Sequence, residues 1–308
     1  FTAEVEYQSG STAQYHITTG YLGDHRFALV RDSARRIKET LQSNGAQHIM
    51  AFFDENSRED ARWHSSHIDM SENFKFLIQK VLDEPWFGLV IKPKLARHLR
   101  ARLGPVDDLL NLAEATGRCH VFDDDGFRGL HPPVAAALAS DIAVHSHLSA
   151  ATAGIESALA GVPTLLLDTE GWSRSPLYRL GLGITVFTSW NDIWSACLEQ
   201  WSNPAMSPRL GDWSIMLDDL DPFRDGRASE RMGTYLHWLL ESFKDGKDRE
   251  VAMSDAAQRY GELWGYDKVT DINWGTTGPG DPSTNGDFTD PAIHSPTGGL
   301  DDRSHTTR

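Results

Sequence analysis

Residues 140–171 read SDIAVHSHLSAATAGIESALAGVPTLLLDTEG. The apolar segment at 142–144 is short and predicts a buried strand. Small residues then open a helix that we expect over 152–160, and a Gly-Val-Pro break at 161–163 ends it. A second apolar strand follows at 164–167. Two apolar strands joined through a helix predict parallel strands that are covered on both faces.

The same alternation of strands and helices extends on both sides of this unit. We expect further strands at 48–53, 87–91, 119–122 and 183–187. We expect helices at 27–41, 74–82, 106–115, 133–139, 190–201, 229–243 and 253–264. This order predicts an α/β fold with a Rossmann-like, doubly wound parallel sheet.

Composition narrows the class of protein. The formal net charge of −15 argues against nonspecific binding to nucleic acid, which needs clustered Lys and Arg. Apolar runs stay well below the roughly 20 residues of a membrane span, and the first residues do not read as a signal peptide. Cys119 and Cys197 match no metal or redox spacing, so we expect reduced, structural thiols and a cytoplasmic protein. Phe1 stands where an initiator Met is usual, so we expect a processed chain or a piece of a longer one.

Polar residues gather where the strand at 142–144 ends and the next helix begins. Ligands of open parallel sheets bind at such strand ends, and a helix N-terminus favours phosphate because its N–H groups are unpaired. Small residues at the helix start let a ligand approach the backbone, and a carboxylate one turn later can reach a sugar hydroxyl. The residues that we expect to bind a nucleotide or nucleotide sugar are His145, His147, Ser149, Thr152, Ala153, Gly154 and Glu156.

An alternative interpretation of this cluster is purely structural. Ser149 and Thr152 can cap the helix, and Glu156 can interact with its dipole. Capping explains less well why two histidines and a small-residue helix start coincide at one strand end. The chain has no phosphate loop with Gly-Lys-Ser/Thr, and its first strand–helix turn has no G-x-G-x-x-G pattern. A nucleotide triphosphatase and a nicotinamide dehydrogenase are therefore disfavoured.

Other strand ends offer further candidates. Lys92 and Lys94 can neutralise donor phosphates or can be ordinary solvated loop lysines. Glu170 follows the strand at 164–167 and can contact the donor. Asp54, Glu55 and Asn56 end the first strand, either near a ligand or as a helix cap. Asp123, Asp124 and Asp125 match no known calcium loop and predict an acidic turn, and we expect no metal and no cofactor.

Four stretches of the chain resemble a known family. The run SHLSAATAGIESALAGVPTLLLD at 146–168 resembles the donor-binding region in the C-terminal domain of GT-B glycosyltransferases. That region has a small-residue helix start, a Glu within the helix and a Gly-x-Pro before the next strand. SPLY at 175–178, VFTSW at 186–190 and DPFRDGRA at 221–228 are similar to bacterial capsule and surface-polysaccharide biosynthesis proteins of that class. The resemblance covers roughly residues 46–245.

The resemblance implies a transferase of two domains with a cleft between them. Residues 1–45 would be the end of a truncated N-terminal domain with the inter-domain connection. Residues 46–268 would be the Rossmann-like domain that binds a nucleotide-sugar donor, together with C-terminal helices. The polar, Gly- and Pro-rich residues 269–308 bury too little surface to offset their ordering entropy, so we expect a disordered tail.

The resemblance also implies roles for individual residues and partners. Ser149, Thr152 and Gly154 would bind the phosphates, and Glu156 would hold hydroxyls of the ribose or donor sugar. The acceptor would be a glycan or a lipid-linked glycan of a surface or capsular polysaccharide. The resemblance allows peripheral association with membrane assembly machinery at the inner face of the membrane. A catalytic base is not assigned, and an epimerase of the same fold or a noncatalytic scaffold stay open as alternatives.

Overall fold

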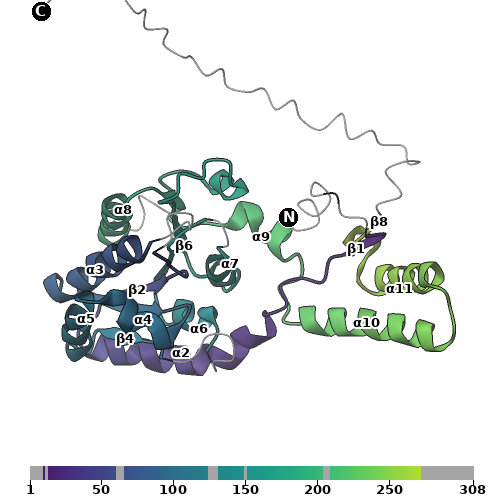
Figure 1. Ribbon diagram of the computed structural model, residues 1–308, viewed down its shortest axis with the longest axis horizontal. Helices are drawn as coiled ribbons and strands as arrows, with labels where there is room; N and C mark the ends of the chain where they lie inside the picture. The colour runs from purple at the N-terminus through teal and green to yellow at the C-terminus, as the bar shows by residue number, and fades with distance from the viewer. Residues whose placement is uncertain are drawn as a thin grey trace, which may run out of the picture.

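A six-stranded parallel sheet forms the centre of the molecule in our computed structural model, which describes residues 10, 13–59, 66–123, 131–148, 151–203 and 209–271 (Figure 1). Its strands are β2 (His48–Phe53), β3 (Phe87–Lys92), β4 (Cys119–Val121), β5 (Ile142–His145), β6 (Thr164–Leu167) and β7 (Val186–Phe187). They lie in the order β4-β3-β2-β5-β6-β7, and every neighbouring pair is parallel. The predicted Rossmann-like, doubly wound sheet is confirmed.

The direction of winding reverses between β2 and β5. From β2 the chain winds outward through β3 to β4, and it then crosses back to place β5 against the other edge of β2. The register aligns Met50 with Ile142 at one end and Phe53 with His145 at the other. In open α/β sheets the crevice at the carboxyl ends of two such strands is the usual place for a ligand. The fold therefore points to the residues that follow Phe53 and His145.

Helices cover both faces of the sheet. Residues of β2 alternate between two cores: Met50 and Phe52 belong to one, and Ile49, Ala51 and Phe53 to the other. This alternation is the period of two that a strand buried on both faces requires. The first core is completed by α3 (His67–Asp83), α4 (Ala96–Leu103), α5 (Val106–Ala115) and α8 (Trp190–Ser202). The second core is completed by α2 (His25–Ser43) and α6 (Pro133–Leu138), and α7 (Thr152–Leu159) packs beside α6.

The two ends of the described chain meet in a separate small layer. β1 (Tyr15–Ile17) pairs antiparallel with β8 (Val269–Asp271), and both lie with α10 (Ala228–Lys244) and α11 (Arg249–Trp264) beside the α/β unit (Figure 1). Tyr260 of α11 is fully buried, and its hydroxyl donates to the backbone oxygen of Thr18 at 2.8 Å. The C-terminal helices therefore hold the N-terminal segment in place.

A buried carboxylate joins this layer to the sheet. Asp221 follows α9 (Ser214–Leu220), is 1% exposed, and accepts the backbone N–H groups of Tyr21, Phe223 and the residue after Phe223. The buried guanidinium of Arg231 lies 3.6 Å from the ring centroid of Phe223 and pairs with Asp225. The DPFRDGRA stretch therefore has a structural role at the start of α10.

Most helix and strand predictions agree with the structure, and the exceptions have local causes. α3 begins at His67, well before the predicted residue 74, because Ser66 and Asp69 form a capping box at its start. The predicted strand at 183–187 is shortened to Val186–Phe187. The helices α4 and α9 were not predicted.

The predicted division into domains stays a prediction. α2, which falls in the predicted connection at 1–45, packs against α6 on the face of the sheet. Residues 272–308 of the predicted tail lie outside the described residues. Among the helices that the structure describes, none has the length and apolar content to cross a membrane.

Candidate functional site

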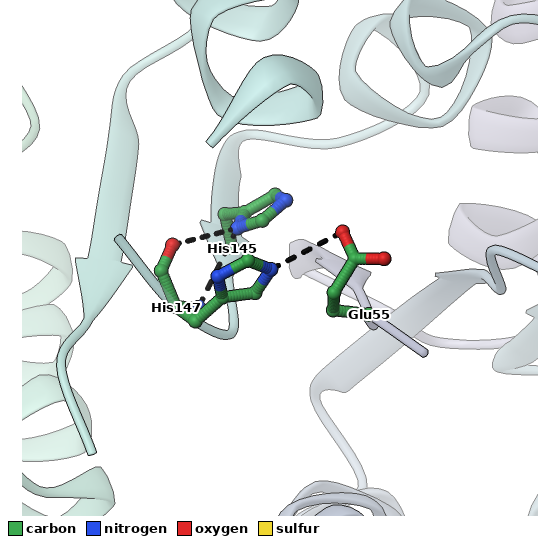
Figure 2. A group of neighbouring side chains, drawn as sticks. All are labelled: Glu55, His145 and His147. Carbon is green, nitrogen blue, oxygen red and sulfur yellow. Dashed lines mark hydrogen bonds and ion pairs between the residues drawn. The ribbon is translucent and has the colours of Figure 1, made fainter. Parts of the chain in front are cut away.

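A buried group of three side chains lies where the sheet reverses its winding. Glu55 follows β2, His145 ends β5, and His147 comes two residues later (Figure 2). The distance from His147 Nε2 to Glu55 Oε2 is 3.2 Å, and His145 Nδ1 lies 2.9 Å from the backbone oxygen of His147. All three residues are buried, with exposed fractions of 7%, 2% and 2%. The parallel register of β2 and β5 brings them together although they are far apart in the sequence.

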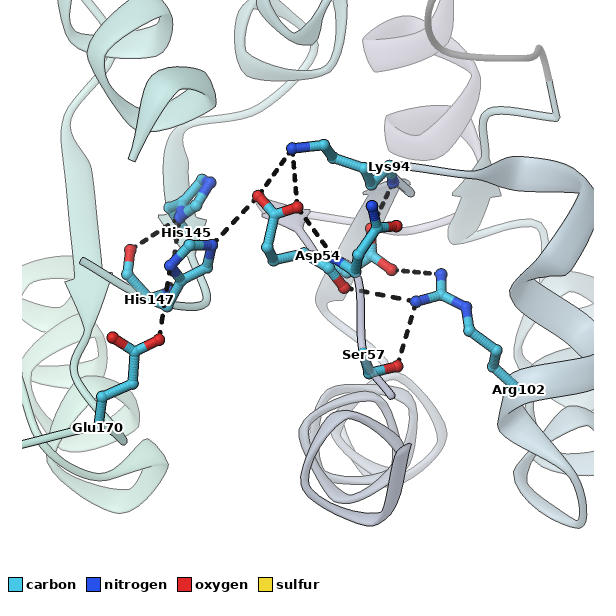
Figure 3. A network of polar contacts seen from close by, with 9 residues as sticks. Asp54, Ser57, Lys94, Arg102, His145, His147 and Glu170 are labelled. Carbon is cyan, nitrogen blue, oxygen red and sulfur yellow. Dashed lines mark hydrogen bonds and ion pairs between the residues drawn. The ribbon is translucent and has the colours of Figure 1, made fainter. Parts of the chain in front are cut away.

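The two flanking strands each add a charged side chain. Lys94 follows β3, and its ammonium lies 2.7 Å from Glu55 Oε1 (Figure 3). Glu170 follows β6, and its Oε1 lies 3.7 Å from His147 Nδ1. The Lys94 side chain is 49% exposed, while that of Glu170 is 11% exposed. Four neighbouring strand ends therefore supply one connected group of charged and imidazole side chains.

A buried ion pair holds the loops after β2 and β3 in place. The Asp54 side chain is fully buried, and its Oδ2 accepts a hydrogen bond from Arg102 of α4 at 2.6 Å (Figure 3). The backbone N–H of Lys94 donates to the other carboxylate oxygen of Asp54. Burial raises the pKa of Asp54, and the Arg102 guanidinium opposes that rise. Because Asp54 precedes Glu55 and accepts the backbone N–H of Lys94, the ion pair holds both of these residues in position.

The electrostatics of the cluster give its members different protonation states. Burial, with a smaller contribution from the neighbouring His147, lowers the pKa of His145 to about 3, so this imidazole is neutral near pH 7. Burial by itself raises the pKa of Glu55, but hydrogen bonds from His147 and Lys94 outweigh burial. These bonds hold the pKa of Glu55 well below its usual range, so its carboxylate is ionised.

The predicted ligand-binding role of the start of α7 stays a prediction, and the structure shows how its residues are packed. Ala151 precedes the helix with φ 38°, a left-handed conformation that is uncommon for a residue with a Cβ. Thr152 is exposed and Ala153 is half-buried. Gly154 is buried against the sheet, where an added Cβ would lie 3.2 Å from Leu166 Cδ2 and 3.5 Å from His145 Cβ. The absence of a side chain at Gly154 thus serves the close packing of α7 on the sheet; Ser149 lies outside the described residues.

Glu156 is engaged within the protein. Its Oε1 accepts the N–H of Val134 at the start of α6 at 2.8 Å, and its Oε2 accepts the hydroxyl of Tyr21 at 2.6 Å. The residue is 6% exposed, and burial is the main cause that raises its pKa. The predicted contact of Glu156 with a sugar stays a prediction.

The structure thus brings together part of the predicted site. His145, His147, Lys94 and Glu170 belong to the cluster, as does Glu55 from the first strand end. Lys92 is buried as the last residue of β3, with its ammonium 5.8 Å from the ring centroid of Phe122. Arg102 and Tyr21 were missed, and only the basic composition of 97–102 pointed toward Arg102.

A cavity of about 490 Å³ lies apart from this cluster, between α2 and β4. Its lining includes Arg36, His120 and Phe122, and it shares no residue with the cluster. The charged cluster at the strand ends and the cavity between α2 and β4 are therefore separate features.

Comparisons with known proteins give little beyond the fold. No family model matches the chain, and no curated protein sequence matches it. One similar solved structure is the sucrose-phosphate synthase from Thermosynechococcus elongatus, with a TM-score of 0.37 and 15% identity. The match covers 68% of this chain and 49% of the synthase, so the chain spans about half the length of that protein. A likeness this weak carries no argument about function, which must come from the chemistry of the strand ends.

Proposed function

We propose that this chain is the donor-binding half of a glycosyltransferase of the GT-B type. It would bind a nucleotide-activated sugar and pass the sugar to a surface or capsular polysaccharide acceptor. The single observation that carries the proposal is the convergence of Lys94, His147, Glu55 and Glu170 at the point where the sheet reverses its winding. Sites of open α/β sheets that bind nucleotides occupy this place.

The mixture of charges favours a ligand that carries both phosphates and hydroxyls. The Lys94 side chain is half exposed and flexible, so its ammonium can turn from Glu55 toward a phosphate oxygen. A cation at that point stabilises the negative charge that builds on a departing nucleotide. The carboxylates of Glu55 and Glu170 repel a bare phosphate but accept hydrogen bonds from sugar hydroxyls. A nucleotide sugar offers both kinds of group in one molecule.

The finer parts of the proposal rest on sequence resemblance. The stretches at 175–178, 186–190 and 221–228 favour a capsular or surface polysaccharide as acceptor. A lipid-linked acceptor would bring the protein to the inner face of the membrane beside assembly machinery. We assign no catalytic base among the described residues, because none of their contacts identifies where the acceptor glycan binds.

Calorimetry with a panel of nucleoside diphosphates and nucleotide sugars tests the proposal. We expect one base to bind, and Lys94→Met to weaken that binding about 10- to 100-fold, the loss of one charge-assisted hydrogen bond. Lys75→Met is the matched control, because Lys75 is an exposed lysine paired with Glu72 on α3. The control should leave the affinity unchanged.

Two outcomes would overturn the proposal in different ways. If no nucleotide or nucleotide sugar binds the intact protein, the chain is a noncatalytic scaffold. If the bound donor is converted to its epimer without any acceptor, the chain is an epimerase of the same fold. Transfer of the sugar to an added glycan acceptor by the full-length protein would support the transferase.

A further inference from the structure

The side chains of Glu55, His145 and His147 have the composition and spacing of a metal site. They offer two imidazole nitrogens and a carboxylate oxygen, and these atoms all lie within 4.8 Å of one another (Figure 2). His147 Nε2 and Glu55 Oε2 are 3.2 Å apart. Two ligands that are each about 2.1 Å from a tetrahedral ion lie about 3.4 Å apart, so this pair is already at coordination distance.

The second nitrogen of each histidine has a partner that orients the ring. His145 Nδ1 lies 2.9 Å from the backbone oxygen of His147, so a proton on Nδ1 donates there and Nε2 keeps its lone pair. That second nitrogen of His145 lies on the Glu55 side of the ring (Figure 2). His147 Nδ1 faces Glu170 Oε1 at 3.7 Å. Histidines that bind metals typically donate their other N–H to a backbone carbonyl or a carboxylate in this way.

The environment of Glu170 also favours a proton on His147 Nδ1. Its Oε1 is buried and accepts no hydrogen bond within the described part of the chain. A buried carboxylate oxygen without a donor is costly, and a proton on His147 Nδ1, which lies 3.7 Å away, stabilises its charge electrostatically. With the proton on Nδ1 in place of Nε2, His147 gives up its hydrogen bond to Glu55, and Nε2 presents its lone pair to an ion held between the two side chains. The contact with Glu170 is thus a reason for His147 to adopt the tautomer that binds a metal.

We propose that Glu55, His145 and His147 bind a divalent transition-metal ion such as Zn²⁺, with Glu170 positioning His147. Two imidazoles and one carboxylate suit Zn²⁺ better than Mg²⁺ or Ca²⁺, which take oxygen ligands. Three protein ligands leave one coordination position for water or a ligand. This inference does not depend on the proposed transferase, because the metal is tested without any nucleotide.

Lys94 competes with the metal for the same carboxylate. Its ammonium lies 2.7 Å from Glu55 Oε1, where it supplies the positive charge that balances Glu55. An ion bound to Glu55 would meet this ammonium at close range and repel it. The half-exposed side chain can swing out to water. Removal of the ammonium should therefore strengthen metal binding, although the same change weakens nucleotide binding under the proposed function.

Metal titration of the full chain tests the inference. The protein is treated with a chelator and dialysed, then titrated with Zn²⁺ against a chromophoric chelator and with Co²⁺ by visible absorption. We expect one Zn²⁺ per chain and a tetrahedral Co²⁺ spectrum. Glu55→Gln and His147→Gln should each weaken Zn²⁺ binding by at least about tenfold, as loss of even an orienting partner costs 10- to 100-fold. Lys94→Met should tighten it.

His237→Gln is the matched control, because His237 is an exposed histidine that pairs with a glutamate on α10. Thermal melts establish that each variant is folded, and Glu55→Gln keeps the size of the side chain. The inference is overturned if the wild-type chain binds no Zn²⁺ at micromolar concentration. It is equally overturned if Glu55→Gln and His147→Gln bind Zn²⁺ as tightly as the His237→Gln control. Neither result bears on nucleotide binding, which calorimetry measures separately.

Discussion

The buried carboxylate of Glu156 ties three parts of the chain together, and substituting it tests that role. It accepts the N–H of Val134 from α6 and the hydroxyl of Tyr21 from the N-terminal segment, while Glu156 itself belongs to α7. Glu156→Ala removes both acceptors at once. Glu156→Gln keeps the shape: its amide oxygen accepts from Val134, and its NH₂ group donates to the hydroxyl oxygen of Tyr21.

The free energy of unfolding should separate the two variants. A buried donor left without an acceptor costs about 1–3 kcal/mol. The N–H of Val134 is buried and the Tyr21 side chain is half-buried, so we expect Glu156→Ala to lose about 2–4 kcal/mol. For a unit of this size, 1 kcal/mol moves the melting temperature by about 2–4 °C, so the Ala variant should melt about 4–16 °C lower. The Gln variant should stay within about 1 kcal/mol of the wild type.

The pH dependence gives the same substitution a second readout. Burial raises the folded-state pKa of Glu156 above its ordinary value of 4.5. The folded carboxyl therefore holds its proton more tightly than the unfolded chain does. This contribution to stability is complete below the unfolded pKa and is lost as the pH rises through the folded pKa. Glutamine has no such proton, so the stability of Glu156→Gln relative to wild type should increase as the pH rises above about 4.5.

Thermal and urea unfolding followed by circular dichroism, at several pH values between about 4.5 and 8, measure both effects. The reasoning is refuted if Glu156→Ala melts within about 1 °C of the wild type, or if Glu156→Gln loses as much as Glu156→Ala. The same proteins also test the predicted sugar contact. A Gln variant of normal stability that binds a nucleotide sugar less tightly than the free nucleoside diphosphate would favour a role of Glu156 at the sugar.

Two further predictions concern the buried carboxylate of Asp221 and the two buried thiols. Asp221→Ala deprives three backbone N–H groups of their acceptor and should cost about 3–5 kcal/mol in urea unfolding. The control Asp219→Ala, at an exposed position of α9, should cost almost nothing, and equal losses in the two variants would contradict the structural role of Asp221. Burial raises the pKa of Cys119, and it raises that of Cys197 to about 12, so both thiols should resist a thiol reagent in the native protein and react on unfolding. A thiol that reacts rapidly before unfolding would show that the core around it opens.

The parallel sheet was predictable because its strands are short apolar runs with clear stops. The predicted bounds of β2, β6 and α5 coincide with the structure, since each run ends at polar, Gly or Pro residues. β7 is shorter than predicted for a local reason. The N–H groups of Thr185 and Val186 bond back to the oxygen of Gly181, so the residues before Val186 form a turn and not a strand.

The features that sequence did not predict depend on contacts between distant segments. α4 is basic and buries only Leu99 and Leu103, so it has no apolar stripe that marks it as a helix. The pairing of Arg102 with Asp54 and that of Tyr21 with Glu156 join segments that no local pattern connects. β1 and β8 pair across nearly the whole described chain. Only the packed structure brings these partners together.

The predicted site residues on α7 and those at the strand ends differ in what else they do in the structure. Gly154 allows the helix to lie against Leu166, and Glu156 ties the helix to α6. Both residues are buried and contact other parts of the protein, so a substitution at either of them also changes packing. Strand ends are different, because a parallel sheet places the residues after β2, β3, β5 and β6 at one edge whatever helices follow. Variants at Lys94 and His147 therefore probe ligand chemistry directly, while variants at Gly154 and Glu156 first report on packing.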